Sequence, residues 1–310
     1  MRAIDTSTYF TFAGWSSLLT LTAEAFSKAD LPEFIPRIYA KLIPALEELC
    51  QYAEIADIHG KIKDAYTTLH IQKHCKRFFS AYFRVGFFGS LFGSMNGSEY
   101  IYRVAPFTKL TEMTQRVVVY LQITYVEPYF EKHELDLRTT ALQRNYMLKQ
   151  FSYSIPFTPS GTPYGSLSEQ FQRQIILTTD HHFPYLTSRM PVASKRFCIL
   201  SPIEVVIGDI SRRVQQLDEV LDVKPVDVKL LQMLLQGCIG TTVNRGPAEA
   251  AFTFLKPDLL PIHPQSVSLP GSPPILDITG YADAQNKLRV CFRRLLQSYV
   301  PVVHKVALFW

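Results

Sequence analysis

The spacing of the hydrophobic residues changes twice along this 310-residue chain, and that change limits the folds open to it. Up to about Ser80 apolar residues recur every three or four positions, as on one face of a helix. From Tyr82 onward they form short aromatic and β-branched runs bounded by Gly, Pro and Asn, which are typical of strands. Helical spacing returns at Ser201. The sequence therefore predicts an α+β fold with three parts: a helical N-terminal lobe at 1–80, an antiparallel β-sheet lobe at 81–200 and a C-terminal helix bundle with an interrupted helix at 201–310.

The middle zone is expected to be antiparallel, because its connections are too short for the crossover helices that parallel strands need. Its first two strands are predicted to form a hairpin that turns near Asn96 and Gly97. Gly86, Gly89 and Gly93 are interpreted as bends in that hairpin, since neither phosphate-binding glycine motif is present.

The last zone opens with a strong helix start. In "SPIE", Ser201 is expected to cap the helix, with Pro202 at its first position and Glu204 reaching back to the cap. Three further helices are predicted at about 225–236, at about 247–255 and from about Ala282 until Pro301 disturbs the last one. A Pro- and Ser-rich insertion is predicted at about 256–281.

Composition narrows the class of protein. The 32 Lys and Arg residues exceed the 27 Asp and Glu residues by a net charge of only +5, and they are scattered, so no nucleic-acid partner is expected. The five cysteines are far apart and never spaced C-x-x-C, which indicates a reducing, cytoplasmic compartment and neither disulfides nor a zinc site. No stretch approaches the ~18 apolar residues of a transmembrane helix.

Motifs for covalent or metal-assisted catalysis are missing from the sequence. It contains no G-x-S-x-G, no H-E-x-x-H and no recognisable Cys-His pair. His181 and His182 are adjacent on a predicted strand, so their side chains should point to opposite faces and not share a metal. We therefore expect no enzyme, metal site or cofactor, and a protein that acts by binding; a hydrolase with unfamiliar machinery stays a remote alternative.

One interruption of the helical pattern needs an explanation. The stretch "LLQGCIGTTVNRGP", which ends at Pro247, contains β-branched residues and only one charge. Gly237, Gly240 and Gly246 would let the chain leave a helix and turn, and Pro247 suits the first position of the next helix. The break is either a plain connector with Val243 in the core or a displayed loop, and spacing alone favours the connector.

Five stretches, in this order and spacing, resemble a known family. They are "YFRVGFFGSLFG", "LQITYVEPYF", "PFTPSGTPYGSLSEQFQRQIILTTDHHFPYLTSRMPV", "LSPIEVVIGDI" and "LLQMLLQGCIGTTVNRGPAEAAFTFL". They resemble the catalytic DOCKER domain (Dock homology region two) of dedicator-of-cytokinesis proteins, most closely the Zizimin-related subfamily. The similarity runs from about residue 10 to 256 and resumes near Asn286.

The resemblance implies a guanine nucleotide exchange factor for Rho-family small GTPases of the Cdc42 or Rac type. It implies a helical lobe that can form a homodimer, a sheet lobe that grips the GTPase, and a loop whose valine, the nucleotide sensor, occludes the magnesium position. The motif places this valine at Val243. The neighbouring residues expected to contact the partner are Gly240, Thr241, Thr242, Asn244, Arg245 and Gly246.

The chain departs from the family at one point that bears on activity. Family members carry a longer segment between the equivalents of "FTKLTEMTQR" and "LQITYVEPYF", where this chain has only "VVVY". Part of the sheet lobe is therefore expected to be missing. The alternative function is a GTPase-binding scaffold that keeps the fold but does not promote exchange.

Overall fold

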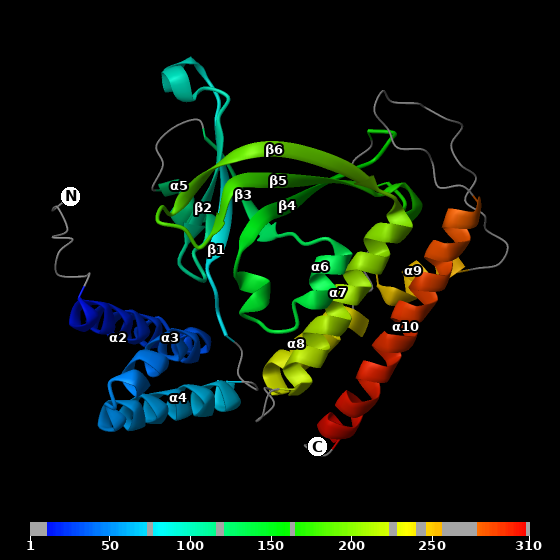
Figure 1. Cartoon of the computed structure of the whole chain (residues 1–310). Coiled ribbons are helices and arrows are strands. Elements are labelled where there is room, and N and C mark those ends of the chain that lie inside the picture. The colour runs from blue at the N-terminus through cyan, green and yellow to red at the C-terminus, as the bar shows by residue number, and fades with distance from the viewer. Residues whose placement is uncertain are drawn as a thin grey trace. The chain divides into compact units, whose positions relative to one another are not determined.

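The computed structural model combines helices with one antiparallel sheet (Figure 1). It describes residues 11–72, 77–115, 121–161, 165–222, 228–239, 246–255 and 278–307. The chain divides into two compact units, Met1–Arg77 and Phe78–Trp310. The predicted α+β class is confirmed. The lobe limits near residues 80 and 200 stay a prediction, because the sheet and the C-terminal helices belong to one unit.

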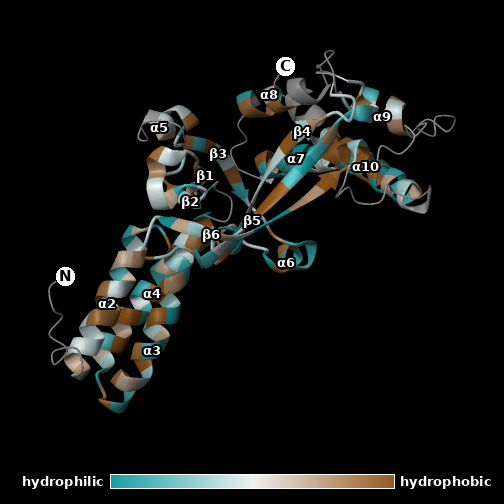
Figure 2. Ribbon diagram, turned by 90° about the horizontal axis from the view of Figure 1, so that it is seen from above, coloured by the Kyte–Doolittle hydropathy of each residue, from teal (hydrophilic) through white to brown (hydrophobic). Residues whose placement is uncertain are grey.

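The described part of the first unit contains three α-helices. They are α2 (Phe12–Lys28), α3 (Ile35–Glu48) and α4 (Tyr52–Gln72), with the short 3-10 turn η1 (Pro32–Phe34) between α2 and α3. The side chain of Thr11 caps α2 by accepting the N–H of Gly14 at 3.1 Å. Figure 2 shows hydrophobic bands along α2 and α3, as expected for helices that bury one face against each other. The buried hydrophobic cluster of this unit consists of Ala23, Ile35, Tyr39, Leu42, Leu46, Ile58 and Ala65.

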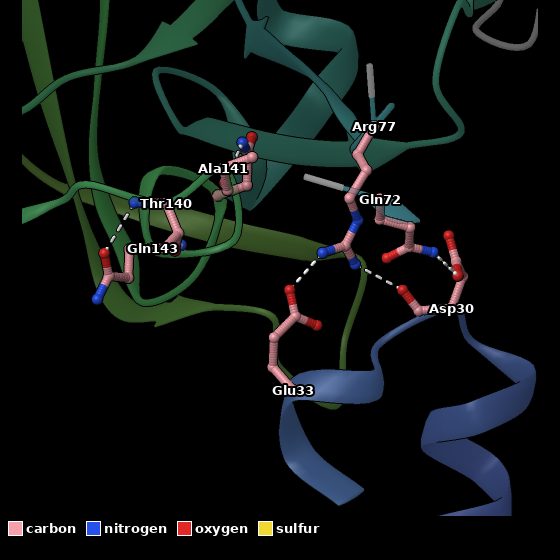
Figure 3. Close-up of polar contacts among 8 residues, drawn as sticks. Asp30, Glu33, Gln72, Arg77, Thr140, Ala141 and Gln143 are labelled. Atoms are coloured by element: carbon pink, nitrogen blue, oxygen red, sulfur yellow. Dashed lines mark hydrogen bonds and ion pairs between the residues drawn. The ribbon is translucent and has the colours of Figure 1, made fainter. Parts of the chain in front are cut away.

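The turn between α2 and α3 also holds the C-terminal end of the unit (Figure 3). Gln72 donates a hydrogen bond from Nε2 to Asp30 Oδ1 at 2.6 Å. Arg77 donates to the Asp30 carbonyl oxygen at 2.6 Å and pairs with the Glu33 carboxylate. These polar contacts tie the last residues of the first unit to a turn more than forty positions earlier.

In the described residues of the second unit, six antiparallel strands close into a barrel. They are β1 (Ala81–Phe87), β2 (Glu99–Val104), β3 (Leu121–Pro128), β4 (Leu148–Phe157), β5 (Phe171–Phe183) and β6 (Arg189–Leu200). Their order around the barrel is β1-β2-β6-β5-β4-β3, and every pair is antiparallel, so the predicted sheet is confirmed. The short elements of the connections are η2 (Ser90–Met95), α5 (Leu110–Gln115), α6 (Lys132–Leu137), η3 (Gln143–Asn145) and η4 (Leu167–Glu169). In the loop after α6, Gln143 and Thr140 exchange two hydrogen bonds between side chain and backbone (Figure 3).

The hairpin of β1 and β2 turns where the sequence predicted. Ser98 donates its N–H to the Met95 carbonyl at 3.0 Å, across Asn96 and Gly97. Gly97 has a φ of 81°, a conformation that favours glycine at the third position of a type II turn. The hairpin tip is longer than a tight turn, because η2 lies between β1 and Asn96.

Strand β1 is buried on both of its faces. Tyr82 belongs to a cluster inside the barrel, whereas Phe83 and Val85 pack on the other face with Met113 of α5. The residues of the inner cluster are Tyr82, Ile101, Val126, Leu148, Phe151, Ile175, Leu177, Phe183 and Met190. Burial on both sides explains why this strand is almost uniformly apolar instead of alternating.

Where the structure describes the chain after the barrel, it contains four longer helices. They are α7 (Pro202–Asp222), α8 (Val228–Ile239), α9 (Pro247–Leu255) and α10 (Ile278–Ala307). Ser201 donates its N–H and its hydroxyl to Glu204 Oε2 at 2.9 and 2.6 Å, which confirms the predicted helix start. α7 and α10 lie side by side, and Ser298 donates to Asp218 Oδ1 across them at 2.8 Å (Figure 1). The buried apolar residues of α7 recur at helical spacing and are Ile203, Val206, Ile210, Val214 and Leu217.

Three predicted helix ends were wrong. α8 continues through Gly237 to Ile239, because a single glycine costs a helix only about 1 kcal/mol. α10 begins at Ile278, four residues before the predicted start, so the predicted Pro-rich insertion ends earlier. α10 also continues past Pro301 to Ala307, since a proline removes one N–H donor while the turns on either side keep theirs. Among the described helices, none has the length and apolar composition needed to span a membrane.

Candidate functional site

The predicted sensor loop connects two described helices. Outside the described residues lie Gly240, Thr241, Thr242, Val243, Asn244 and Arg245. α8 ends at Ile239, directly before them, and the half-buried Gly246 follows them. The Gly246 carbonyl accepts the N–H of Ala250 at 3.1 Å, so Gly246 opens α9 and Pro247 is its first residue. The predicted helix restart is confirmed; the partner contact of Gly246 stays a prediction.

Helix α9 is fixed against the rest of the bundle. Ala250 and Phe254 are buried in the same cluster as residues of α7 and α10. Gln285 of α10 donates from Nε2 to the Phe254 carbonyl at 2.7 Å, which satisfies a carbonyl near the helix end that lacks a partner within the helix. Packing and a hydrogen bond therefore hold α9, the helix that follows the interval 240–245, in place.

A buried ion pair joins strands β1 and β2 of the barrel. Arg84 of β1 is only 2% exposed and donates from Nε and Nη2 to the two carboxylate oxygens of Glu99 on β2, both at 2.7 Å. Its Nη1 also donates to Gln122 of β3 at 3.1 Å. Lys195 of β6 lies 3.3 Å from Glu99. This cluster joins four strands by hydrogen bonds and ion pairs.

The pKa values of Glu99 and Arg84 are both shifted away from neutral pH. The hydrogen bonds from Arg84 lower the pKa of Glu99, and the positive charges of Arg84 and Lys195 add to that effect against the cost of burial. The hydrogen bond to Glu99 raises the pKa of Arg84. A carboxylate with a lowered pKa is a poor general acid, so the pair serves barrel structure and not acid–base chemistry.

An arginine between two aromatic rings marks an exposed face of β4, β5 and β6. The guanidinium of Arg173 lies 5.6 Å from the Phe157 ring centre and 5.9 Å from that of Phe197. Phe197 is 58% exposed, and Ile155, opposite Arg173 on the neighbouring strand, is 48% exposed. An arginine and aromatic side chains on one rigid face are the residue types that protein interfaces use most.

Sequence reasoning missed Arg84, Glu99 and Arg173. The burial of Arg84 could have been predicted, because an arginine inside "YFRVGFF" has apolar or glycine neighbours on both sides and needs a buried partner. That partner depends on the pairing of β1 with β2, in which Gly86 lies opposite Glu99. Arg173 and its two rings come from three different strands, so no local pattern brings them together.

The described residues contain no group of three or more His, Cys, Asp or Glu side chains placed to hold a metal ion. His181 lies on β5, as predicted for a strand residue, and its ring stacks on Tyr185 with centres 4.8 Å apart. In the described part of the chain, the main features are the exposed face around Arg173 and the buried ion pair of Arg84 and Glu99.

Comparison with protein-family models identifies the class of domain. The model of DHR-2 Lobe A matches residues 2–70, that of DHR-2 Lobe B residues 105–182, and that of DHR-2 Lobe C residues 216–268. The three lobes follow one another along the chain in the order A, B, C. The chain therefore carries a DHR-2 region.

Curated relatives lead to the same family. Dedicator of cytokinesis protein 8 from Homo sapiens is 36% identical over 327 aligned residues, which cover 96% of this chain. Dedicator of cytokinesis protein 7 from Mus musculus is 37% identical over 94% of the chain, and dedicator of cytokinesis protein 9 from Homo sapiens is 31% identical over 77%. The chain spans only 14 to 15% of the length of these relatives. It belongs to the dedicator of cytokinesis family.

Proposed function

We propose that this chain is a guanine nucleotide exchange factor for a Rho-family small GTPase of the Cdc42 or Rac type. The observation that supports it most is the ordered match to DHR-2 Lobes A, B and C together with an interval of six residues, 240–245, between two packed helices. The chain would act by binding, without forming covalent bonds to the nucleotide, in the cytoplasm.

The proposed mechanism follows from how a GTPase holds GDP. Backbone groups, a lysine and a magnesium ion neutralise the phosphates, so a protein that stabilises the nucleotide-free form more than the GDP-bound form speeds release. Val243 would occupy the position of the ion and offer no ligand in its place. Loss of the divalent charge leaves phosphate repulsion uncompensated, and GDP departs faster.

The other residues of the interval would support this insertion. Gly240 and Gly246 give the backbone freedom to turn, while Thr241, Thr242 and Asn244 would contact the GTPase surface. The interval contains no carboxylate that the phosphate-binding site would repel. Arg245 adds a positive charge that favours approach to that site.

A second function is supported by a difference in length. The alignment with dedicator of cytokinesis protein 8 runs over 327 residues, more than this chain contains, so the relative has residues within the aligned span that this chain lacks. A shortened sheet lobe that still binds a GTPase but no longer opens its nucleotide site would be a scaffold. The barrel nevertheless closes, and β1 and β3 pair along six consecutive residues on each strand, which favours the active form.

Release of fluorescent GDP from a panel of purified Cdc42, Rac and Rho proteins separates the two functions. An exchange factor accelerates release with a rate that saturates as the chain concentration rises, and it does so for the Cdc42 or Rac type. A scaffold binds one of these GTPases but leaves the release rate at its intrinsic value. Neither binding nor acceleration with any member of the panel would overturn both functions.

Self-association through the N-terminal lobe is a further part of the proposal. Leu18 and Leu21, three positions apart on α2, are 46% and 59% exposed, which supports an apolar contact between two copies. Light scattering should give twice the mass of the 35.4 kDa chain. A monomeric mass at micromolar concentration would contradict the dimer. It would not contradict the proposed exchange activity.

A further inference from the structure

The connection between β4 and β5 inserts a side chain into the helix bundle. This connection belongs to the sheet, yet its short 3-10 turn, η4, contacts both α7 and α9. Leu167, the first residue of η4, is 8% exposed and lies in the same buried cluster as Ala250 and Phe254 of α9. Within the described residues, it is the one barrel connection that contributes a side chain to this helical core.

The backbone around Leu167 is held by its own hydrogen bonds. The Ser166 side chain accepts a backbone bond from Glu169, and the Ser166 N–H donates to Glu169 Oε2 at 3.1 Å, forming a capping box. Gln170 donates from Nε2 to the Gly165 carbonyl at 2.9 Å. A Cβ at Gly165 would come within 2.8 Å of Glu169 Oε2, so this position has no room for a larger residue unless the carboxylate moves. The turn therefore presents Leu167 in a defined place.

Helix α9 depends on such external contacts for its position. It has only nine residues, and helices shorter than about 12 residues are marginal on their own in water. Its contacts come from α7, from α10 through Gln285 and from η4 through the cluster that includes Leu167. η4 leads directly into the sheet, since β5 begins two residues after Glu169, and α7 gives a second link, since it begins two residues after the end of β6.

We propose that Leu167 is a positioning residue. It fixes α9 relative to the barrel and so sets the point at which the interval 240–245 rejoins the helix bundle. This inference rests on the proposed exchange function. If the sheet binds the GTPase while the interval before α9 acts on its nucleotide, both must engage one partner at once. A displacement of α9 then lowers the rate at which bound GTPase releases GDP and leaves binding through the sheet unchanged.

The test compares two cavity-forming substitutions in one core. Leu167→Ala removes the side chain that η4 contributes to the cluster shared with α9. Leu295→Ala is the matched control, because Leu295 is 2% exposed in the same cluster but lies ten residues beyond Gln285, about 15 Å along α10. Leu167→Met, which keeps the volume, should restore the parent behaviour. Glu169→Ala removes the capping bond but keeps Leu167, so it should give a smaller change in the same direction.

Two readouts are measured on the full chain. GDP release is followed against chain concentration, which separates the plateau rate from the half-saturating concentration. Leu167→Ala should lower the plateau about fivefold or more and leave half-saturation within about twofold, whereas Leu295→Ala should leave the plateau within about twofold. Hydrogen exchange of the amides in 248–255 should accelerate about tenfold in Leu167→Ala and much less in the control.

The outcomes separate this inference from the exchange function. An equal loss of plateau rate in both Ala variants, or unchanged amide exchange of α9 in Leu167→Ala, would overturn the positioning role even if the parent is an active exchange factor. If the parent chain does not accelerate GDP release from any GTPase, the proposed exchange function is wrong. The amide exchange of α9 then still decides whether Leu167 positions the helix.

Discussion

Removing the carboxylate of Glu99 should destabilise the barrel more than removing the guanidinium that binds it. Arg84 is 2% exposed, and without Glu99 its only remaining side-chain hydrogen bond among the described residues is the one to the neutral Gln122. Glu99 without Arg84 would still lie 3.3 Å from Lys195, and its side chain is 15% exposed. The two losses are therefore unequal, although they break the same pair.

The magnitudes follow from what each substitution leaves behind. Glu99→Leu leaves a buried, uncompensated positive charge, which should cost about 3–5 kcal/mol of unfolding free energy. Arg84→Met leaves a carboxylate with a second cation and partial hydration, for which we expect about 2 kcal/mol. The double variant removes both buried charges and should come within about 1 kcal/mol of the parent.

Amide hydrogen exchange of β1 and β2 is the suitable assay. Two compact units make a single global unfolding curve a poor measure, because they need not unfold together. Local exchange reports the opening free energy of the two strands, and the amides of α3 in the other unit serve as an internal control that should not change. A cost below about 1 kcal/mol for Glu99→Leu, or a double variant as unstable as the sum of both single variants, would refute the buried-charge account.

Two further predictions concern the same barrel. Because the pKa of Glu99 is lowered in the folded chain, its contribution to stability is present above its usual value of 4.5 and is lost as the pH falls through the lowered one. The protection of the β2 amides, taken relative to the intrinsic exchange rate at each pH, should therefore fall below about pH 4.5, and less so in the Arg84→Met/Glu99→Leu variant. Gly86→Ala would place a Cβ 2.5 Å from the Phe88 ring and should cost about 1 kcal/mol as that ring moves away. The same exchange measurement should show almost no cost in a Phe88→Ala background, and an equal cost in both backgrounds would contradict the clash.

Local patterns predicted the elements that depend on neighbours in sequence. Helical spacing returns at Ser201 as predicted and continues through the buried residues of α7, and the start of α7 follows from a cap whose partner, Glu204, is three residues away. At the candidate site, the same kind of evidence placed the restart of α9 at Pro247. These signals act within one helical turn, so they can be read without knowing the rest of the fold.

Contacts between segments far apart in the sequence could not be predicted from local patterns. The buried pair of Arg84 and Glu99 depends on strand register, and the closure of β2 on β6 brings Tyr100 opposite Pro191. Leu167 follows a stretch of Gly, Ser and Pro that indicated only a loop. Its burial results from packing against α7 and α9, which no local period encodes.

The plateau rate of GDP release in the Val243→Ala variant tests the central claim most directly. The variant shortens the side chain proposed to occupy the magnesium position and leaves the barrel unchanged. Release at saturating chain should be about tenfold slower than with the parent, corresponding to about 1–2 kcal/mol, while affinity for the GTPase changes little. Met233→Ala, on an exposed position of α8, should match the parent. Equal plateau rates for Val243→Ala and the parent would contradict the proposed role of the loop.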